Sequence, residues 1–203
     1  MKKIITILFV VFICTTTSSF AQRFGVKGGF NITNLNVEGH DYSAKLGIHI
    51  GPVAEFHFGD IFGLETGVLL STKGAKEKFG DDTYKINLTY LDFPVNFRAG
   101  YDFGTTRVYG ILGPYFGFAL GGKYKNEIND VKTSTKIEFG DGGLSRFDAG
   151  LTIGACAAVS IFELGFSYNH GFVDISGDSG HKMKNRVFML SMAYKFGENP
   201  FRK

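Results

Sequence analysis

The sequence predicts an all-β protein: an eight-stranded antiparallel up-and-down transmembrane β-barrel that follows a cleaved N-terminal signal peptide. Apolar residues alternate with small or polar residues over successive segments of about ten residues, as in barrel strands that face lipid on one side. The connections between these segments are alternately long and short. No window after the N-terminus has a convincing helical period.

The N-terminus has the pattern of a secretory signal. Lysines at positions 2 and 3 supply positive charge, an apolar run follows, and the small residues Ser19 and Ala21 precede the expected cleavage site after Ala21. The apolar run is too short for a transmembrane helix, which needs about 20 residues. The sequence therefore divides into a signal peptide, 1–21, and a β-barrel domain, 22–203, on a protein that leaves the cytoplasm.

Composition excludes several classes of function. Without the two signal lysines, the 22 Lys+Arg fall to 20 against 19 Asp+Glu, and a net charge of +1 provides no footprint for nucleic acid. Cys14 leaves with the signal, so Cys156 has no partner for an intrachain disulfide. His49 and His57 share a strand face roughly 26 Å apart, too far for one metal ion. We expect no metal and no cofactor.

The first half of the chain contains four predicted strands. Each places apolar side chains on one face and mostly glycine or polar side chains on the other. The strands cover 24–32, 45–58, 62–71 and 84–101. In the fourth strand the apolar residues change from even to odd positions between Tyr90 and Leu91, and this change of frame predicts a β-bulge there.

The second half contains the other four, over 107–120, 146–159, 162–169 and 186–196. The last strand shows the alternation most clearly, because one of its faces consists of Phe188, Leu190, Met192, Tyr194 and Phe196. Long connections are predicted at the outer face of the membrane, and short turns with both termini at the periplasmic face. The predicted outer loops are 33–44, 74–83, 121–145 and 171–185.

Three prolines, Pro52, Pro94 and Pro114, fall inside predicted strands. Proline cannot donate a ladder hydrogen bond, and a closed barrel has no free edge to hold it. We therefore expect each proline at a bulge or near a strand end, with Pro94 beside the predicted frame change.

The alternation alone is also compatible with a soluble lipocalin-like barrel that binds an apolar ligand inside. An eight-stranded barrel, however, has an interior only wide enough to be filled by side chains. The apolar face carries Phe or Tyr in nearly every strand and would overfill that space, whereas the opposite face combines Gly and Ala with occasional charges. We therefore predict that the apolar face contacts lipid.

The charged residues of the opposite face are then expected in the lumen. Because an unpaired buried charge is costly, residues of opposite sign must pair there. We predict a salt-bridged network that plugs the lumen; the selectivity filter of a narrow pore is the alternative. The predicted network is Lys27, Glu55, Glu65, Asp92, Arg98, Arg107, Arg146, Asp148, Glu163 and Lys195, and Lys45 lies on the same face.

Four stretches, 24–31, 90–95, 113–115 and 185–196, resemble the eight-stranded outer-membrane β-barrel family of Bacteroidota that includes PorT. The resemblance implies a location in the outer membrane of a Gram-negative bacterium, with outer-membrane lipid around the barrel. It also implies insertion by the barrel-assembly machinery, with the apolar face of the last strand as the recognition signal. A protein partner, extracellular or from a secretion system, is left unidentified by these motifs.

An enzyme is the other interpretation. The segment 177–180 resembles the nucleophile segment of trypsin-like proteases, but His181 stands where a further glycine belongs. Some eight-stranded outer-membrane barrels modify lipids with Ser, His and a carboxylate near the outer rim, and Ser167, His170, Ser179 and His181 are expected near that rim. We predict no catalytic residues and a structural or interaction role carried by the outer loops.

Overall fold

The computed structural model describes residues 22–37, 40–41, 43–79, 82–128, 131–140, 143–176 and 182–197. Within them no helix is long and apolar enough to cross a membrane. The strands are β1 (Gln22–Val37), β2 (His40–Asp41), β3 (Lys45–Phe58), β4 (Phe62–Gly67), β5 (Leu69–Phe79), β6 (Asp82–Phe103), β7 (Thr106–Ile128), β8 (Val131–Lys136), β9 (Phe147–Val159), β10 (Phe162–Gly171) and β11 (Met183–Gly197). The predicted signal peptide, its cleavage site and the segment 177–181 lie outside the described residues.

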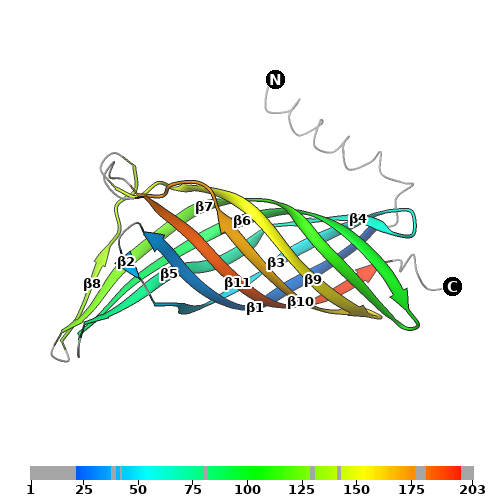
Figure 1. Cartoon of the computed structure of the whole chain (residues 1–203), viewed down its shortest axis with the longest axis horizontal. Helices are drawn as coiled ribbons and strands as arrows, with labels where there is room; N and C mark the ends of the chain where they lie inside the picture. The colour runs from blue at the N-terminus through cyan, green and yellow to red at the C-terminus, as the bar shows by residue number, and fades with distance from the viewer. Residues whose placement is uncertain are drawn as a thin grey trace, which may run out of the picture.

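The strands close into a tilted barrel (Figure 1). Its ring has eight members, because β4 and β5 follow one another as two parts of one interrupted strand, and β2 and β8 lie beyond the ring. Neighbours pair antiparallel in sequence order, and β1 closes the ring by pairing with both β3 and β11. The predicted eight-stranded antiparallel up-and-down barrel is confirmed.

Three short turns, at 59–61, 104–105 and 160–161, lie at the end of the barrel where β1 begins and β11 ends (Figure 1). Gly59 and Gly104 have φ angles of 71° and 63°, which glycine adopts without a steric penalty. Because outer-membrane barrels have short periplasmic turns and long outer connections, we assign this end to the periplasm and the opposite end to the outside.

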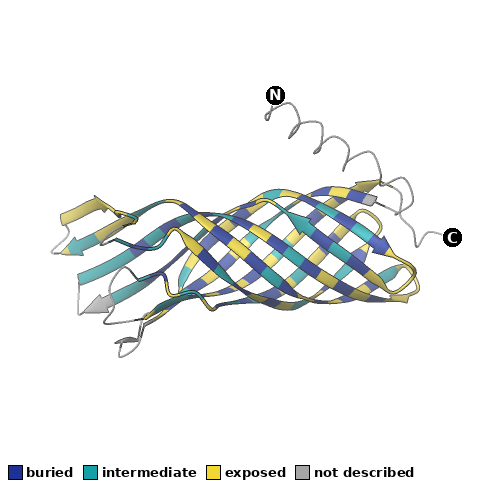
Figure 2. Cartoon of the chain, turned by 90° about the horizontal axis from the view of Figure 1, so that it is seen from above, coloured by how far each residue is buried: buried dark blue, intermediate teal, exposed yellow. Residues whose placement is uncertain are grey.

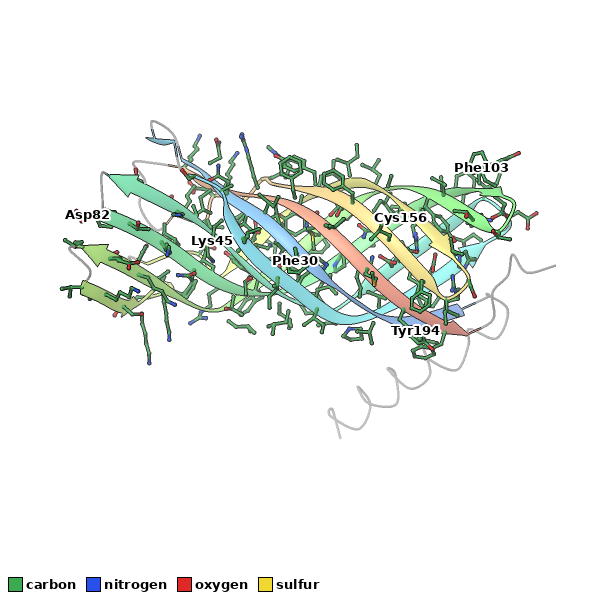
Figure 3. All side chains as sticks on the ribbon, turned by 90° about the horizontal axis from the view of Figure 1, so that it is seen from below. Phe30, Lys45, Asp82, Phe103, Cys156 and Tyr194 are labelled. Atoms are coloured by element: carbon green, nitrogen blue, oxygen red, sulfur yellow. The ribbon has the colours of Figure 1, made fainter. Side chains whose placement is uncertain are left out.

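Two of the predicted outer loops are largely β-structure. The stretch 74–83 continues β5 and opens β6, and much of 121–145 continues β7 and forms β8. The outer parts of these four strands, residues 74–79, 82–89, 121–128 and 131–136, rise above the ring as a sheet that we call the outer extension. Figure 3 shows Asp82 at the far end of this sheet and Phe103 at the opposite end of the molecule. The prediction of loops here was wrong because the polar residues of these stretches lie on the water-facing side of β-strands.

The outside of the ring is apolar, and Figure 2 shows buried and exposed residues alternating along its strands. Large side chains such as Phe30 and Phe97 are more than half exposed. The outward residues of β11 are also exposed, namely Phe188, Leu190, Met192, Tyr194 and Phe196. The apolar face therefore points away from the lumen, as a lipid-facing surface requires.

The predicted bulge lies one residue away from its expected place, but on the neighbouring strand. Thr89 of β6 is opposite Gly121 and Tyr90 is opposite Ala119, so that Leu120 of β7 is the extra residue. Strand β6 itself does not change face: its even-numbered residues point inward along its length, those from Ile86 to Gly100 buried. The change of frame in its apolar pattern therefore has another cause, which lies in the surroundings of the strand.

The prolines lie at mid-strand interruptions of the ladder, so the expectation of bulges or strand ends is wrong. Pro52 of β3 lies opposite the break between β4 and β5. The amide of Val68 donates to the Pro52 carbonyl at 3.0 Å, but proline has no N–H with which to form the second ladder hydrogen bond. Pro94 borders a gap in the β6–β7 pairing, and Pro114 lies within that gap. Thr66 Oγ1 donates to the Pro94 carbonyl at 2.9 Å near this gap.

Candidate functional site in the barrel lumen

The lumen is lined by the inward residues of the ring, and glycines make room for its long polar side chains. Gly25 of β1 lies opposite Lys195 of β11, and a Cβ at Gly25 would lie 2.9 Å from Lys195 Cγ. A Cβ at Gly117 would lie 2.7 Å from Asp92 Oδ1. Glycine at these positions therefore lets a narrow barrel enclose charged groups without a clash.

The largest group of charges lies in the periplasmic half of the lumen. Arg98 Nη1 is 2.5 Å from Glu55 Oε1 and 3.2 Å from Glu65 Oε2, while Arg98 Nη2 is 2.5 Å from Glu163 Oε2. Lys195 Nζ contacts the same three carboxylates at 3.0, 2.6 and 2.9 Å. We call the following residues the Arg98 cluster: Lys27, Glu55, Glu65, Arg98, Glu163 and Lys195.

The Arg98 cluster balances its charges, with three cations and three carboxylates. Glu55 and Glu65 are directly opposite each other on β3 and β4, an arrangement that by itself destabilises a sheet. Arg98 and Lys195 offset this repulsion, and Lys27 Nζ also binds Glu65. Five of the six ions are almost fully buried and the Lys27 side chain is 12% exposed, so removing any one would leave an uncompensated charge in a low dielectric.

A second group lies nearer the outer end and is centred on Lys73 of β5. Lys73 Nζ is 2.9 Å from Asp92 Oδ1 and 3.1 Å from Asp148 Oδ2, and lies 4.6 Å from the ring centroid of Tyr90. Asp148 also accepts a hydrogen bond from Tyr115 Oη at 3.2 Å. We call these three residues, Lys73, Asp92 and Asp148, the Lys73 cluster. It consists of one cation between two carboxylates.

A small cavity, lined by both polar and apolar side chains, separates the two clusters. Its volume is about 40 Å³, enough for roughly three water molecules. Asn96, Thr152 and Asn169 line it, and the side-chain oxygens of all three have no hydrogen-bond partner in the described protein. Because such buried oxygens are normally satisfied, we expect ordered water here.

Beyond the Lys73 cluster the lumen becomes apolar. Inward side chains of the ring and extension pack there against Ile137, Phe139 and Leu144, and against Val173 and Ile175. The buried members of this apolar cap are Leu35, Ala75, Ile86, Leu88, Tyr90, Ala119, Ile137, Leu144 and Ile175. From the periplasmic end outward, the interior thus contains an ion cluster, a small cavity, a second ion cluster and an apolar cap.

Nine of the ten residues of the predicted lumen network face the interior. Six belong to the Arg98 cluster, and Asp92 and Asp148 belong to the Lys73 cluster. Arg107 is buried near the periplasmic turns, where its Nη1 is 2.8 Å from Asp102 Oδ2 and its Nη2 donates to the Asp60 carbonyl.

Arg146 is the exception, and its placement in the lumen was wrong. Its side chain is exposed at the outer end, donates to the Ala119 carbonyl at 3.0 Å and lies 4.8 Å from the Phe139 ring. It precedes the first residue of β9, so the alternation of that strand does not govern it. Lys45, at the first residue of β3, is half-buried.

Sequence reasoning missed Lys73, the only cation of its cluster. The predicted third strand stopped at Ser71, although Lys73 continues the inward positions of Glu65 and Ser71 by one further step. It also missed the buried pair of Asn31 and His49, whose Oδ1 and Nδ1 atoms are 2.7 Å apart. Extending the alternation into the charged stretch would have found Lys73.

The described residues do not assemble a catalytic group from the earlier candidates. Ser167 is buried on the inward face of β10, whereas His170 lies three residues on and therefore on the opposite face, 3.2 Å from Tyr168 Oη. Ser179 and His181 lie outside the described part of the chain. Among the described residues no group of three or more His, Cys, Asp or Glu could hold a metal ion.

Comparisons with known proteins agree with this architecture. The family model for the outer membrane protein beta-barrel domain matches residues 20–177. No curated protein is significantly similar in sequence. A major outer membrane protein from Thermus thermophilus is 16% identical with a TM-score of 0.50, over 87% of this chain and 100% of that one.

Two further solved structures are similar. Ail, the attachment invasion locus protein of Yersinia pestis, is 17% identical with a TM-score of 0.44, over 87% of this chain and 99% of that one. Neisserial surface protein A is 12% identical with a TM-score of 0.45, over 85% and 97%. At such identities the likeness concerns the fold alone.

Proposed function

The chain belongs to the outer membrane protein beta-barrel domain family, and on that premise we propose a closed, non-enzymatic barrel that presents its outer extension and loops to a binding partner. The filled lumen carries this proposal. Both ion clusters are buried and paired, and the apolar cap follows them along the same axis. Such an interior favours a structural plug over an ion path, because moving an ion through it would require breaking buried pairs.

Planar-bilayer recording tests the closed lumen. The wild-type barrel is expected to show no discrete conductance steps, since the cavity between its clusters is about 40 Å³. A variant with Arg98→Ala and Tyr109→Ala removes two stacked side chains, 3.9 Å apart from guanidinium to ring centroid, and serves as the opened control. Steps from the wild-type barrel at the level of this control would favour the narrow pore instead.

We further propose that the barrel is PorT-like and comes from the Bacteroidota, on the motifs at 24–31, 90–95, 113–115 and 185–196. Its partner would be an extracellular or secretion-system protein. Photo-crosslinkers at Thr83 and Lys132, both on the outer extension, would trap such a protein in intact cells, with Phe166 on the lipid-facing wall as the control position. Equal capture from all three positions would argue against an outer binding surface.

Residues 1–21 would be removed on export, leaving 22–203 as the outer-membrane domain. N-terminal sequencing of the protein from outer membranes is expected to begin at Gln22. The outward face of β11 would then serve as the signal for the barrel-assembly machinery. Replacing Tyr194 and Phe196 by alanine is expected to lower the amount of inserted barrel several-fold, whereas the same change at Phe24 and Phe30 of β1 would not.

A further inference from the structure

The outward face of the outer extension carries lysines in matching positions on adjacent strands. Lys76 of β5 is opposite Lys85 of β6, which is opposite Lys125 of β7. One step nearer the ring, Lys123 of β7 is opposite Lys136 of β8. Like charges placed directly opposite destabilise a sheet, and an anion bound to this face would remove that penalty.

A hollow of about 520 Å³ lies on this face, where β6 and β7 meet the segment that follows β8. Lys123, Lys125, Lys136 and Arg146 line the hollow, and none of its lining residues is a carboxylate. Asn87 lines it too, with a buried Nδ2 that has no hydrogen-bond partner among the described residues. The hollow thus presents four cations, which is the chemistry that recognises phosphate, and the unpartnered amide of Asn87 lies beneath its surface.

The hollow begins where the lipid-facing wall ends. Leu120, which lines its edge, and Phe118 and Phe147 just below are each about half exposed on the outside of the barrel. Lys123 and Lys125 follow Leu120 by three and five residues, which in a strand tilted by about 40° corresponds to heights of roughly 8 and 13 Å. The interfacial layer of a leaflet extends roughly 5–8 Å beyond the hydrocarbon, so Lys123 lies at its outer edge and Lys125 lies above it.

We propose that this hollow binds the phosphorylated headgroup of an outer-leaflet glycolipid. The cations hold the phosphates, and the acyl chains of the same molecule descend along Leu120, Phe118 and Phe147. A soluble polyanion would match the charge, but it would not use the apolar wall that borders the hollow. This inference goes beyond the proposed closed barrel, and it places a defined lipid on one side of the ring.

The test measures binding of purified bisphosphorylated lipid A to the detergent-solubilised barrel by native mass spectrometry. The variant Lys123→Gln, Lys136→Gln, Arg146→Gln removes three cations of the hollow. The matched control, Lys182→Gln, Lys184→Gln, Arg186→Gln, removes two lysines and one arginine from the outer end of β11 and the residue before it. Retained heat-modifiability on SDS gels establishes that both variants are folded.

We expect at least a tenfold loss of lipid A affinity in the hollow variant and less than a twofold change in the control. Removing both phosphates from lipid A is expected to weaken binding to the wild-type barrel to the same extent. Equal losses in the two variants, or no loss in either, would overturn the proposal. Displacement of lipid A by polyphosphate at equal phosphate concentration would also overturn it, in favour of a soluble polyanion.

Discussion

The membrane ring and the outer extension are built from the same strands but have opposite polarity. In the ring, Phe97 and its neighbours face outward while Arg98 and other polar groups face the lumen. In the extension, Leu88 is buried inside while Lys85 and Lys125 face outward. The ring therefore has an apolar surface, which faces lipid, and a polar interior. The extension has a polar surface, which faces water, and an apolar interior.

Strand β6 passes through both regions without changing face, and this explains its sequence. Up to Tyr90 its apolar residues point into the cap, and from Leu91 onward they point out to lipid. An alternation that switches frame therefore has two structural solutions. One is an inserted residue; the other is a change of solvent along a regular strand, and β6 adopts the second.

The largest effect is expected where the ring holds its charges inside. Arg98→Met leaves Glu55, Glu65 and Glu163 with too little positive charge in a buried site, and should destabilise the folded barrel by about 3–5 kcal/mol. Urea titration of the barrel in lipid vesicles, followed by the gel shift between folded and unfolded bands, measures this. Arg146→Met, at an exposed arginine, is the control, and an equal loss there would contradict a special role for the buried cluster.

Adding a charge to the outside should separate the two regions clearly. Phe166→Lys places an ammonium near the middle of the lipid-facing wall and should cost about 2–4 kcal/mol. Thr83→Lys, in the extension opposite Glu127, should change stability by less than about 0.5 kcal/mol. The same titration applies, and equal costs at the two positions would mean that the extension also contacts lipid.

Truncating an apolar side chain should show the reverse order. Leu88→Ala opens a cavity in the cap and should reduce the free energy of unfolding of the extension by about 2–4 kcal/mol. Hydrogen exchange of the β6 and β7 amides above Leu120 reports it locally. Leu164→Ala, on the half-exposed outer wall, should cost about 1 kcal/mol or less; a larger cost at Leu164 would reverse the comparison.

Removing one lysine from the outer face should be mildly favourable. Lys85→Thr relieves its opposition to both Lys76 and Lys125, and should stabilise the extension by about 0.2–0.5 kcal/mol at low salt. Raising the salt to about 1 M should abolish most of that gain. The measurement is again hydrogen exchange, and a destabilised variant would show that the lysines are paired by some other group.

The smallest effect concerns the loop above the ring. Slight burial would raise the pKa of Asp174, but hydrogen bonds from the amides of Met183 and Ser176 outweigh it and lower that pKa. Since the folded value is the lower one, this stabilisation is present above the unfolded pKa of about 3.9 and is lost as the pH falls further. Exchange protection of the Met183 amide should fall roughly two- to threefold below that pH, and Asp174→Asn should lack the step.

Alternation was enough to predict the ring. The bounds 45–58 of β3 were predicted as the structure has them, because lipid outside and a packed lumen inside both demand a period of two. The hairpins at 74–83 and 121–145 were missed because lysines and threonines there resemble a loop when solvent is assumed on every side. These hairpins alternate as the ring strands do, but their polar face points to water and their apolar face points inward, which is the reverse of the ring.

Which charges meet in the lumen could not be predicted from the pattern. Parity indicates that Glu65 and Lys195 face inward, yet they lie on strands that are not neighbours, and their 2.6 Å contact crosses the lumen. That contact depends on the tilt and stagger of the closed ring, which no local segment encodes. For Arg146 even the direction of the side chain was predicted wrongly, because this residue lies just before β9 and the alternation of inward and outward positions does not extend to it.

The Arg98 cluster spans the seam at which the barrel closes. Lys195 on the last strand and Lys27 on the first contribute two of its three cations, and Lys195 reaches Glu55 over 140 positions of sequence. Before β11 pairs with β1, Lys195 is separated from Glu55 and Glu65, which lie on β3 and β4 on the other side of the seam. Pairing of β11 with β1 therefore forms these ion pairs together with the ladder hydrogen bonds, and closure in a wrong register would lose both. The register of the last strand is thus tied to the neutralisation of buried charge.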